Sequence, residues 1–287
     1  MYSLKTVQEI KVLKSALSNA RSAFSRVGLV PTMGALHRGH LALIQAAKSQ
    51  CDFVIASIFV NPIQFNQPSD FENYPQTLED DLKVLEGQGV DMVFMPSIKE
   101  MYPSSLGVSL SFSHLEKILE GKFRPGHFNG VGIVVAKLLH LVDPHVAFFG
   151  QKDLQQVHVI KALVVGLSFD VEVEVVPTVR EDDGLAFSSR NIRLGKVERE
   201  KAPHLYEALV QAEQDLKTGQ PWSHVKNSCR KSLENSGLVE LEYLALVRLP
   251  EFRLSEKYEA NSEFALCIAA YLGGVRLIDN VIIRPTS

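Results

Sequence analysis

The stretch Val30–Lys48, VPTMGALHRGHLALIQAAK, decides the fold. It continues a short apolar run that stops at Pro31, which is typical of a buried strand ending at a turn. Small residues form the turn and apolar residues at helical spacing follow, so we expect a helix to begin near His37 to His40. The first turn of such a helix offers free N–H groups and the positive end of its dipole to an anion. The stretch therefore predicts a phosphate site built as strand, turn and helix.

Two histidines occur in this stretch with the spacing His37-x-Gly39-His40, which places both rings on the first helical turn. The spacing from Gly34 to Gly39 is that of a P-loop, but a P-loop requires Lys and then Ser or Thr after its second glycine, and this chain has His40 and Leu41 there. The dinucleotide-binding motif G-x-G-x-x-G is also absent. Because a helix N-terminus disfavours positive charge, we expect both rings to be neutral and to donate hydrogen bonds to phosphate oxygens. A polar helix start, or half of a metal site, is the alternative that the pair alone leaves open.

Four segments carry a resemblance to known families. The HRGH tetrad resembles the HIGH signature of the class I aminoacyl-tRNA synthetase-like nucleotidyltransferases, and the longer PTMGALHRGH resembles the pantothenate synthetase family. VNPIQF, FGQKDLQQ and DGLAFSSRN are similar to that family and follow in its order, the last resembling the superfamily's KMSKS-type loop. Gln151 departs from the family pattern, which usually has Glu there. The resemblance is dense up to Asn191 and only general beyond it.

The resemblance implies an ATP-dependent ligase that condenses pantoate with β-alanine through a pantoyl adenylate, giving pantothenate, AMP and pyrophosphate, with Mg²⁺ and as a homodimer. It implies that His37, His40 and Lys152 are the catalytic residues. It also implies two sets of binding residues. Those for ATP are Pro31, Thr32, Met33, Gly34, His37, Gly39, His40, Gly150, Gln151, Lys152, Asp153, Val179, Phe187, Ser188, Ser189 and Arg190, and those for pantoate or β-alanine are Asn61, Gln64, His127 and Gln156.

Some of these residues have a simpler interpretation. Lys152 could form a surface pair with Asp153, and the Ser-Ser-Arg segment could be only a turn. Asp80 and Asp81 lie on a predicted helix at 79–86 and are the candidate Mg²⁺ ligands, since Mg²⁺ commonly takes one or two carboxylates plus substrate phosphate. An exposed polar helix face is the alternative for this pair.

Composition narrows the function classes. The net charge is −3 with no long basic block, so binding to nucleic acid or anionic membranes is not expected. The N-terminus lacks a signal-peptide core, and no apolar window is long enough to span a bilayer. Three cysteines lie far apart in no C-x-x-C pair, which indicates a reduced, cytoplasmic protein without structural zinc.

Helical and strand patterns alternate through the first part of the chain. Strands are expected at 53–60, 91–95, 145–149 and 171–176, helices at 4–17, 129–142 and 154–167, and a short extended piece at 108–112. We expect an α/β fold, with a Rossmann-like doubly wound parallel sheet over residues 1–178. For residues 179–287 we expect a smaller α+β domain. Its sequence patterns predict helices at 196–217 and 223–233 and strands at 239–247, 264–272 and 275–283. Gly273-Gly274 predicts a hairpin between the last two strands.

Two other function classes remain open. A nucleotidylyltransferase shares the HxGH motif and a Ser/Arg loop, but it transfers AMP to a phosphate and stops there. A non-enzymatic relative would sense a nucleotide or contact RNA. The complete His, Lys and Arg set and the lack of a basic appendage count against the non-enzymatic class.

Overall fold

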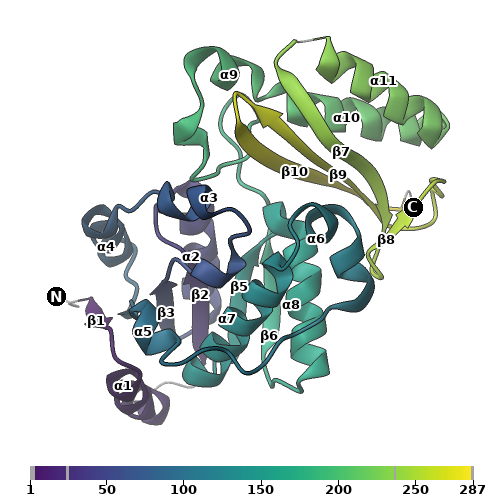
Figure 1. Cartoon of the computed structure of the whole chain (residues 1–287). Coiled ribbons are helices and arrows are strands. Elements are labelled where there is room, and N and C mark those ends of the chain that lie inside the picture. Colours follow the sequence, from purple (N-terminus) through teal and green to yellow (C-terminus); the bar gives the residue numbers. More distant parts are fainter. Residues whose placement is uncertain (1–3, 24–25, 236, 286–287) are drawn as a thin grey trace. The chain divides into compact units, whose positions relative to one another are not determined.

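The computed structural model describes residues 4–23, 26–235 and 237–285. The chain forms two compact units (Figure 1). The first unit comprises residues 1–151 and 155–177, and the second comprises residues 152–154 and 178–287. The short segment Lys152–Leu154 therefore belongs with the second unit, although the chain on either side of it belongs to the first.

The first unit is built on a six-stranded parallel sheet of order β1-β4-β3-β2-β5-β6. β2, β3 and β5 are buried almost throughout, as central strands of a parallel sheet are when helices cover both faces. Strand order reverses between β2 and β5, and ligands of such sheets bind outside the carboxyl ends at this point. The predicted Rossmann-like sheet is confirmed. Its strands are β1 Lys5–Val7, β2 Val27–Thr32, β3 Phe53–Ile58, β4 Met92–Phe94, β5 Val146–Gly150 and β6 Glu172–Val176.

Helices pack on both faces of this sheet. α1, α7 and α8 share one apolar core with alternate strand residues, and α2 and α4 share another. α7 is buried along most of its length, as its apolar sequence predicts. The longer helices are α1 Ile10–Ala23, α2 Arg38–Gln50, α4 Leu78–Gly87, α7 His127–Val142 and α8 Leu154–Gly166; the short ones are η1 Pro62–Gln64, α3 Pro68–Glu72, α5 Ile98–Met101, η2 Ser113–Lys117, α6 Leu119–Phe123 and η3 Gln151–Asp153.

The second unit contains a four-stranded antiparallel sheet of order β10-β9-β7-β8. α10 and α11 share an apolar core with it. Gly273 and Gly274 both have positive φ and join β9 to β10, so the predicted hairpin is confirmed. The elements are η4 Asn191–Arg193, α9 Lys196–Lys201, α10 His204–Lys217, α11 Trp222–Glu234, β7 Val239–Arg248, β8 Arg253–Ser255, β9 Phe264–Leu272 and β10 Val275–Ile283.

Several predicted elements were wrong in detail. The helix expected at 4–17 is strand β1 followed by α1, since a three-residue strand is too short to show alternation. Residues 108–112 form no strand and belong to neither sheet; the Leu110 N–H donates to Asn129 Oδ1 instead. The helix expected at 196–217 is two helices, because Pro203 has no N–H to continue the first. β8 was not predicted.

Two findings bear on the compositional expectations. No disulfide joins the three cysteines, all of which are buried. Among the described helices, none combines the length and the apolarity that crossing a bilayer requires.

Candidate active site

The turn after β2 bends through two residues with positive φ, Gly34 at 80° and Ala35 at 48°. A Cβ on Gly34 would lie 3.1 Å from Asp81 Oδ2, so both the backbone conformation and the space favour glycine. Thr32 Oγ1 accepts a hydrogen bond from the Gly34 N–H at 3.2 Å and donates to the Ser57 carbonyl at 2.7 Å. The turn is thereby fixed to the end of β3. We call this turn, together with the first turn of α2, the elbow (residues 32–40).

Asp81 also holds the elbow. This carboxylate is 3% exposed, and it accepts hydrogen bonds from the N–H groups of Ala35 at 2.9 Å and Leu36 at 2.8 Å. Its neighbour Asp80 is exposed and pairs with Lys83, so the two carboxylates have different surroundings. Sequence reasoning missed this structural role, because the bonded residues are 45 and 46 positions apart in the chain.

The predicted Mg²⁺ site involves both aspartates. Across the part of the chain that the structure describes, no group of three or more His, Cys, Asp or Glu side chains is arranged to hold a metal. Asp80 and Asp81 as Mg²⁺ ligands therefore stay a prediction.

The histidines of the elbow cap helix α2. His37 Nδ1 accepts a hydrogen bond from the Gly39 N–H at 3.2 Å, and His40 Nδ1 accepts one from the His37 N–H at 3.3 Å, forming a reciprocal capping box. A ring nitrogen that accepts a hydrogen bond carries no proton, so each neutral ring has its proton on Nε2. With ring centroids 4.0 Å apart, one helical turn carries two uncharged Nε2–H donors.

Gln64 lies at the end of η1, just after β3, and is 9% exposed. Its Oε1 accepts from Asn61 Nδ2 at 3.2 Å, and its Nε2 donates to Met33 Sδ at 2.9 Å. Asn61 is itself buried, donates to the Gly130 carbonyl at 3.1 Å and accepts from the Tyr102 hydroxyl at 2.8 Å. Because a thioether is a weak acceptor, a ligand oxygen is a better partner for the Gln64 amide than Met33 is. Asn61 therefore orients Gln64, and Gln64 is suited to a polar ligand.

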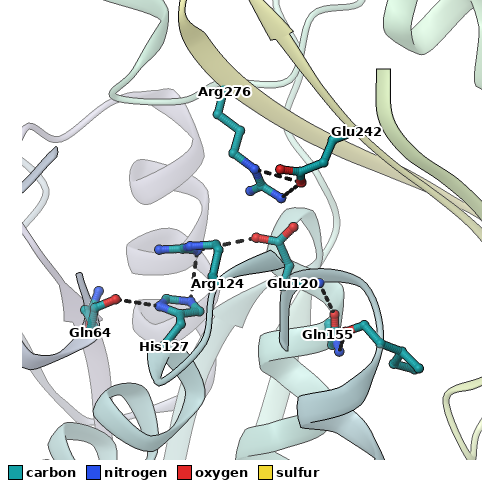
Figure 2. A network of polar contacts seen from close by, with 8 residues as sticks. Gln64, Glu120, Arg124, His127, Gln155, Glu242 and Arg276 are labelled. Carbon is teal, nitrogen blue, oxygen red and sulfur yellow. Dashed lines mark hydrogen bonds and ion pairs between the residues drawn. The ribbon is translucent and has the colours of Figure 1, made fainter. Parts of the chain in front are cut away.

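His127 supports Gln64 through the main chain (Figure 2). His127 Nδ1 lies 2.8 Å from the Gln64 carbonyl oxygen, and Nε2 lies 3.0 Å from Arg124 Nη1. A carbonyl only accepts and a guanidinium only donates, so the proton is on Nδ1, opposite to the two elbow histidines. Arg124 also pairs with Glu120 at 3.4 Å. His127 is 5% exposed, and a direct contact between it and a substrate stays a prediction.

The two glutamines in the first turn of α8 differ. Gln155 is buried, accepts from the Glu120 N–H at 2.9 Å and donates to the carbonyls of Leu115 and Ile118 (Figure 2). Gln156 is half-buried. The structure thus gives Gln155 a structural role and leaves Gln156 as the glutamine of the pair suited to a ligand, which is the residue that the resemblance indicates.

Lys152 lies in η3, which follows directly after Gly150 at the carboxyl end of β5. Its main-chain carbonyl accepts a hydrogen bond from Asn280 Nδ2 at 2.9 Å, and both residues belong to the second unit. Sequence reasoning did not find Asn280, which is 128 positions away. The available signal was Asp279-Asn280, a polar pair between the apolar residues Ile278 and Val281 of β10.

The loop containing the Ser-Ser-Arg segment, residues 179–191, is an irregular hairpin in the second unit. Backbone hydrogen bonds join Glu181 to Leu185 and Phe187 to Val179 across it. Residues 188–190 follow as a half-buried turn, where the Arg190 N–H donates to Ser188 Oγ at 3.3 Å. A phosphate-binding role for Ser188, Ser189 and Arg190 stays a prediction.

Ion pairs hold the turn of this hairpin. Arg199 of α9 contacts Asp183 at 2.5 Å and Glu181 at 2.7 Å. Burial alone would raise the pKa of Asp183, but the hydrogen bonds from Arg199 and from the Leu185 N–H outweigh it and lower that pKa below its usual value. The loop therefore depends on charge, in contrast to the uncharged hydrogen bonds around the elbow histidines.

Comparison with known proteins gives the family. The family model "Pantoate-beta-alanine ligase" matches residues 5–282. A pantothenate synthetase from Cytophaga hutchinsonii is 43% identical over 99% of both chains. The crystal structure of a pantothenate synthetase from Thermus thermophilus superposes with a TM-score of 0.91 at 41% identity, covering 98% of this chain and all of that one. A pantoate-β-alanine ligase from Francisella tularensis, complexed with β,γ-ATP and β-alanine, has a TM-score of 0.81 at 36% identity and 98% coverage of both. The chain belongs to the pantoate–β-alanine ligase family.

Proposed function

We propose that this chain uses ATP to join pantoate to β-alanine by way of a pantoyl adenylate, giving pantothenate, AMP and pyrophosphate. Membership of the ligase family supports the overall reaction. The observation that supports the adenylate route is the pair of Nε2–H donors of His37 and His40 on one helical turn. Met33, within the same elbow, contacts Gln64, the residue proposed to bind the acid substrate.

In the first step, a carboxylate oxygen of pantoate attacks the α-phosphorus of ATP, and the bond to pyrophosphate breaks. Negative charge grows on the phosphate oxygens in the transition state. His37 and His40 donate to those oxygens from a fixed position, so no reorganisation is needed as the charge develops. Lys152 supplies the positive charge, which is worth more in the transition state than with ATP merely bound.

In the second step, the amine of β-alanine attacks the acyl carbon of the adenylate. The carbon–oxygen bond to AMP breaks, AMP leaves with that oxygen, and the amine loses a proton as the amide forms. Gln64 and Gln156 hold pantoate by its hydroxyl and carboxylate groups in the first step, and the pantoyl group by its hydroxyl and carbonyl oxygens in the second. Asn61 and His127 keep Gln64 in place for this role.

The proposal assigns the leaving pyrophosphate to the second signature of the resemblance, the loop with Ser188, Ser189 and Arg190. Hydroxyls donate single hydrogen bonds, and a guanidinium offers a planar fork that matches phosphate oxygens. Mg²⁺ accompanies ATP in this proposal, with Asp80 and Asp81 as its candidate ligands. In this proposal the binding residues are divided between two domains, residues 1–178 and 179–287. The protein is a cytoplasmic homodimer: the cysteine pattern supports the location, and the family resemblance supports the dimer.

Isotope transfer tests the adenylate route directly. Pantoate labelled with ¹⁸O in its carboxylate is incubated with ATP and β-alanine, and the products are examined by mass spectrometry. We expect one ¹⁸O atom in each AMP formed. Label in inorganic phosphate together with ADP would instead indicate an acyl phosphate, and unlabelled AMP joined to another phosphate would indicate a nucleotidylyltransferase; either result would overturn the proposal.

A further inference from the structure

Asp279 and Asn280 are adjacent residues of β10 that are polar and yet 5% and 2% exposed. Neither belongs to a motif of the resemblance. Successive side chains of a strand point to opposite faces of a sheet, so these two meet different partners. Burying a polar side chain costs free energy unless the side chain is hydrogen-bonded. The hydrogen-bond partners of Asp279 and Asn280 therefore indicate the structural role of each residue.

Asn280 holds the main chain of Lys152. Its Nδ2 donates to the Lys152 carbonyl at 2.9 Å. This contact leaves the lysine ammonium uninvolved and fixes the backbone from which the side chain extends. Because side-chain rotamers depend on the local φ and ψ, fixing this carbonyl restricts where the ammonium can lie.

Asp279 holds the base of the loop at residues 179–191. It forms a two-point ion pair with Arg180, with distances of 2.6 and 3.0 Å. Arg180 also donates to the Gly184 carbonyl at 3.1 Å, and its guanidinium carbon lies 3.5 Å from the centre of the Tyr206 ring. Such a paired and stacked arginine is held rigidly. One strand thus anchors the backbone both of Lys152 and of the loop with Ser188–Arg190.

We propose that Asn280 is a positioning residue for adenylation, acting through the main chain of Lys152. The inference rests on the catalytic role proposed for Lys152. A shift of about 1 Å in a catalytic group can cost as much as 10²-fold in rate, and the loss of one neutral hydrogen bond should release the backbone only partly, so we expect a decrease of about tenfold for Asn280→Ala.

A double-mutant cycle on the purified full chain tests this. Single-turnover formation of pyrophosphate from ATP and pantoate is measured for the wild type, Asn280→Ala, Lys152→Ala and the double variant, together with thermal unfolding. Asn280→Leu serves as the second variant, because it has a similar shape and lacks the amide. Ser255→Ala is the control: it loses a side-chain hydrogen bond to backbone at β8, the opposite edge of the same sheet.

The inference predicts that Asn280→Ala and Asn280→Leu lower the adenylation rate about tenfold, with little change in the ATP concentration needed for half-saturation. The double variant should be no slower than Lys152→Ala, because Asn280 then has no lysine to position. Wild-type rates in both Asn280 variants, or effects that multiply in the double variant, would overturn the inference and leave Lys152 catalytic. A normal rate in Lys152→Ala would refute the role proposed for Lys152 itself, and the inference with it.

Discussion

The elbow and the loop at residues 179–191 are both assigned to phosphates, but they are held in different ways. In the elbow, neutral histidines accept backbone N–H groups, and a buried Asp81 accepts two more. The loop depends on pairs of opposite charges, Arg180 with Asp279 and Arg199 with Glu181 and Asp183. The hydrogen bonds of the elbow histidines join uncharged groups and respond little to salt, whereas the partly exposed ion pairs of Arg199 are screened by it.

This difference fits two different functions, stabilising charge at the elbow and releasing product at the loop. A site that must donate to charge as it develops gains from donors that are already fixed, and the elbow meets that requirement. A segment that must release a product gains from contacts that can be broken at small cost. The partly exposed ion pairs of Arg199 are of that kind, whereas the buried Arg180–Asp279 pair fixes the start of the loop. The following variants test that contrast, from the largest expected effect to the smallest.

His40→Ala should have the largest effect, because it removes both an Nε2–H donor and the acceptor that caps the His37 N–H. We expect adenylation to fall by about 10³, the upper end of the range for one preorganised donor, while the protein stays folded. His40→Asn can retain a capping acceptor but lacks the outer donor, so it should be as slow as His40→Ala. Pyrophosphate release in single-turnover assays is the measurement, and an unchanged rate in His40→Ala would remove the elbow from the chemistry.

Lys152→Ala should lower the adenylation rate by roughly 10²–10³, equivalent to about 3–4 kcal/mol, with a much smaller loss of ATP affinity. Lys152→Arg should restore activity only in part, since a broad planar fork replaces a compact charge. The transfer step, started from preformed pantoyl adenylate, should be affected less. If adenylation changed by less than about threefold, Lys152 would be an ordinary surface ion-pair residue.

Gln64→Ala and Gln156→Ala should each raise the pantoate concentration needed for half-saturation by roughly 10–100-fold and the ATP concentration far less. The reason is that loss of one buried hydrogen bond leaves a substrate hydroxyl or carboxylate oxygen without its partner. Steady-state kinetics with each substrate varied in turn gives the comparison. Equal effects on the two substrates would mean that these glutamines only support the fold.

Asp81→Ala should lower the stability of the fold by loosening the elbow. It leaves the N–H groups of Ala35 and Leu36 without an acceptor, at a cost of about 1–3 kcal/mol in the free energy of unfolding. Glu79→Ala, an exposed change in the first turn of the same helix, is the matched control. Urea denaturation measures both, and equal stability of the two variants would show that Asp81 does not hold the elbow.

Arg199→Ala should have the smallest effect, below about 1 kcal/mol, because the Asp183 side chain is 40% exposed and its ion pair is screened. The pKa of Asp183 is lower in the folded state than in the unfolded one, so its contribution to stability is present above the unfolded pKa, near 4, and is lost as the pH falls through the lower folded value. Arg199→Ala should flatten this part of the curve of stability against pH. A steeper loss of stability with falling pH in the variant would contradict the direction of the Asp183 pKa shift.

The sequence predicted the elements with long periodic patterns and the motifs that are local in the chain. The β2–elbow–α2 unit, the parallel sheet and the β9–β10 hairpin all follow from residues that are neighbours in sequence. β1 and β8 are three-residue strands of mixed polar and apolar residues, which show no usable periodicity, whereas β4 has the same length and was predicted because it is apolar throughout. The contacts from Asp81 to the elbow and from Asn280 to Lys152 join distant positions, and one sequence contains no measure of which distant residues meet.

The central claim is that this chain activates pantoate as an adenylate and releases AMP only when β-alanine arrives. The most direct measurement is a quenched time course of ATP with pantoate, with and without β-alanine, in which pyrophosphate, AMP and pantothenate are quantified. Without β-alanine, we expect one pyrophosphate per active site and almost no free AMP; with β-alanine, AMP and pantothenate should appear in equal amounts. Steady release of AMP without β-alanine, or formation of ADP and phosphate, would contradict the claim.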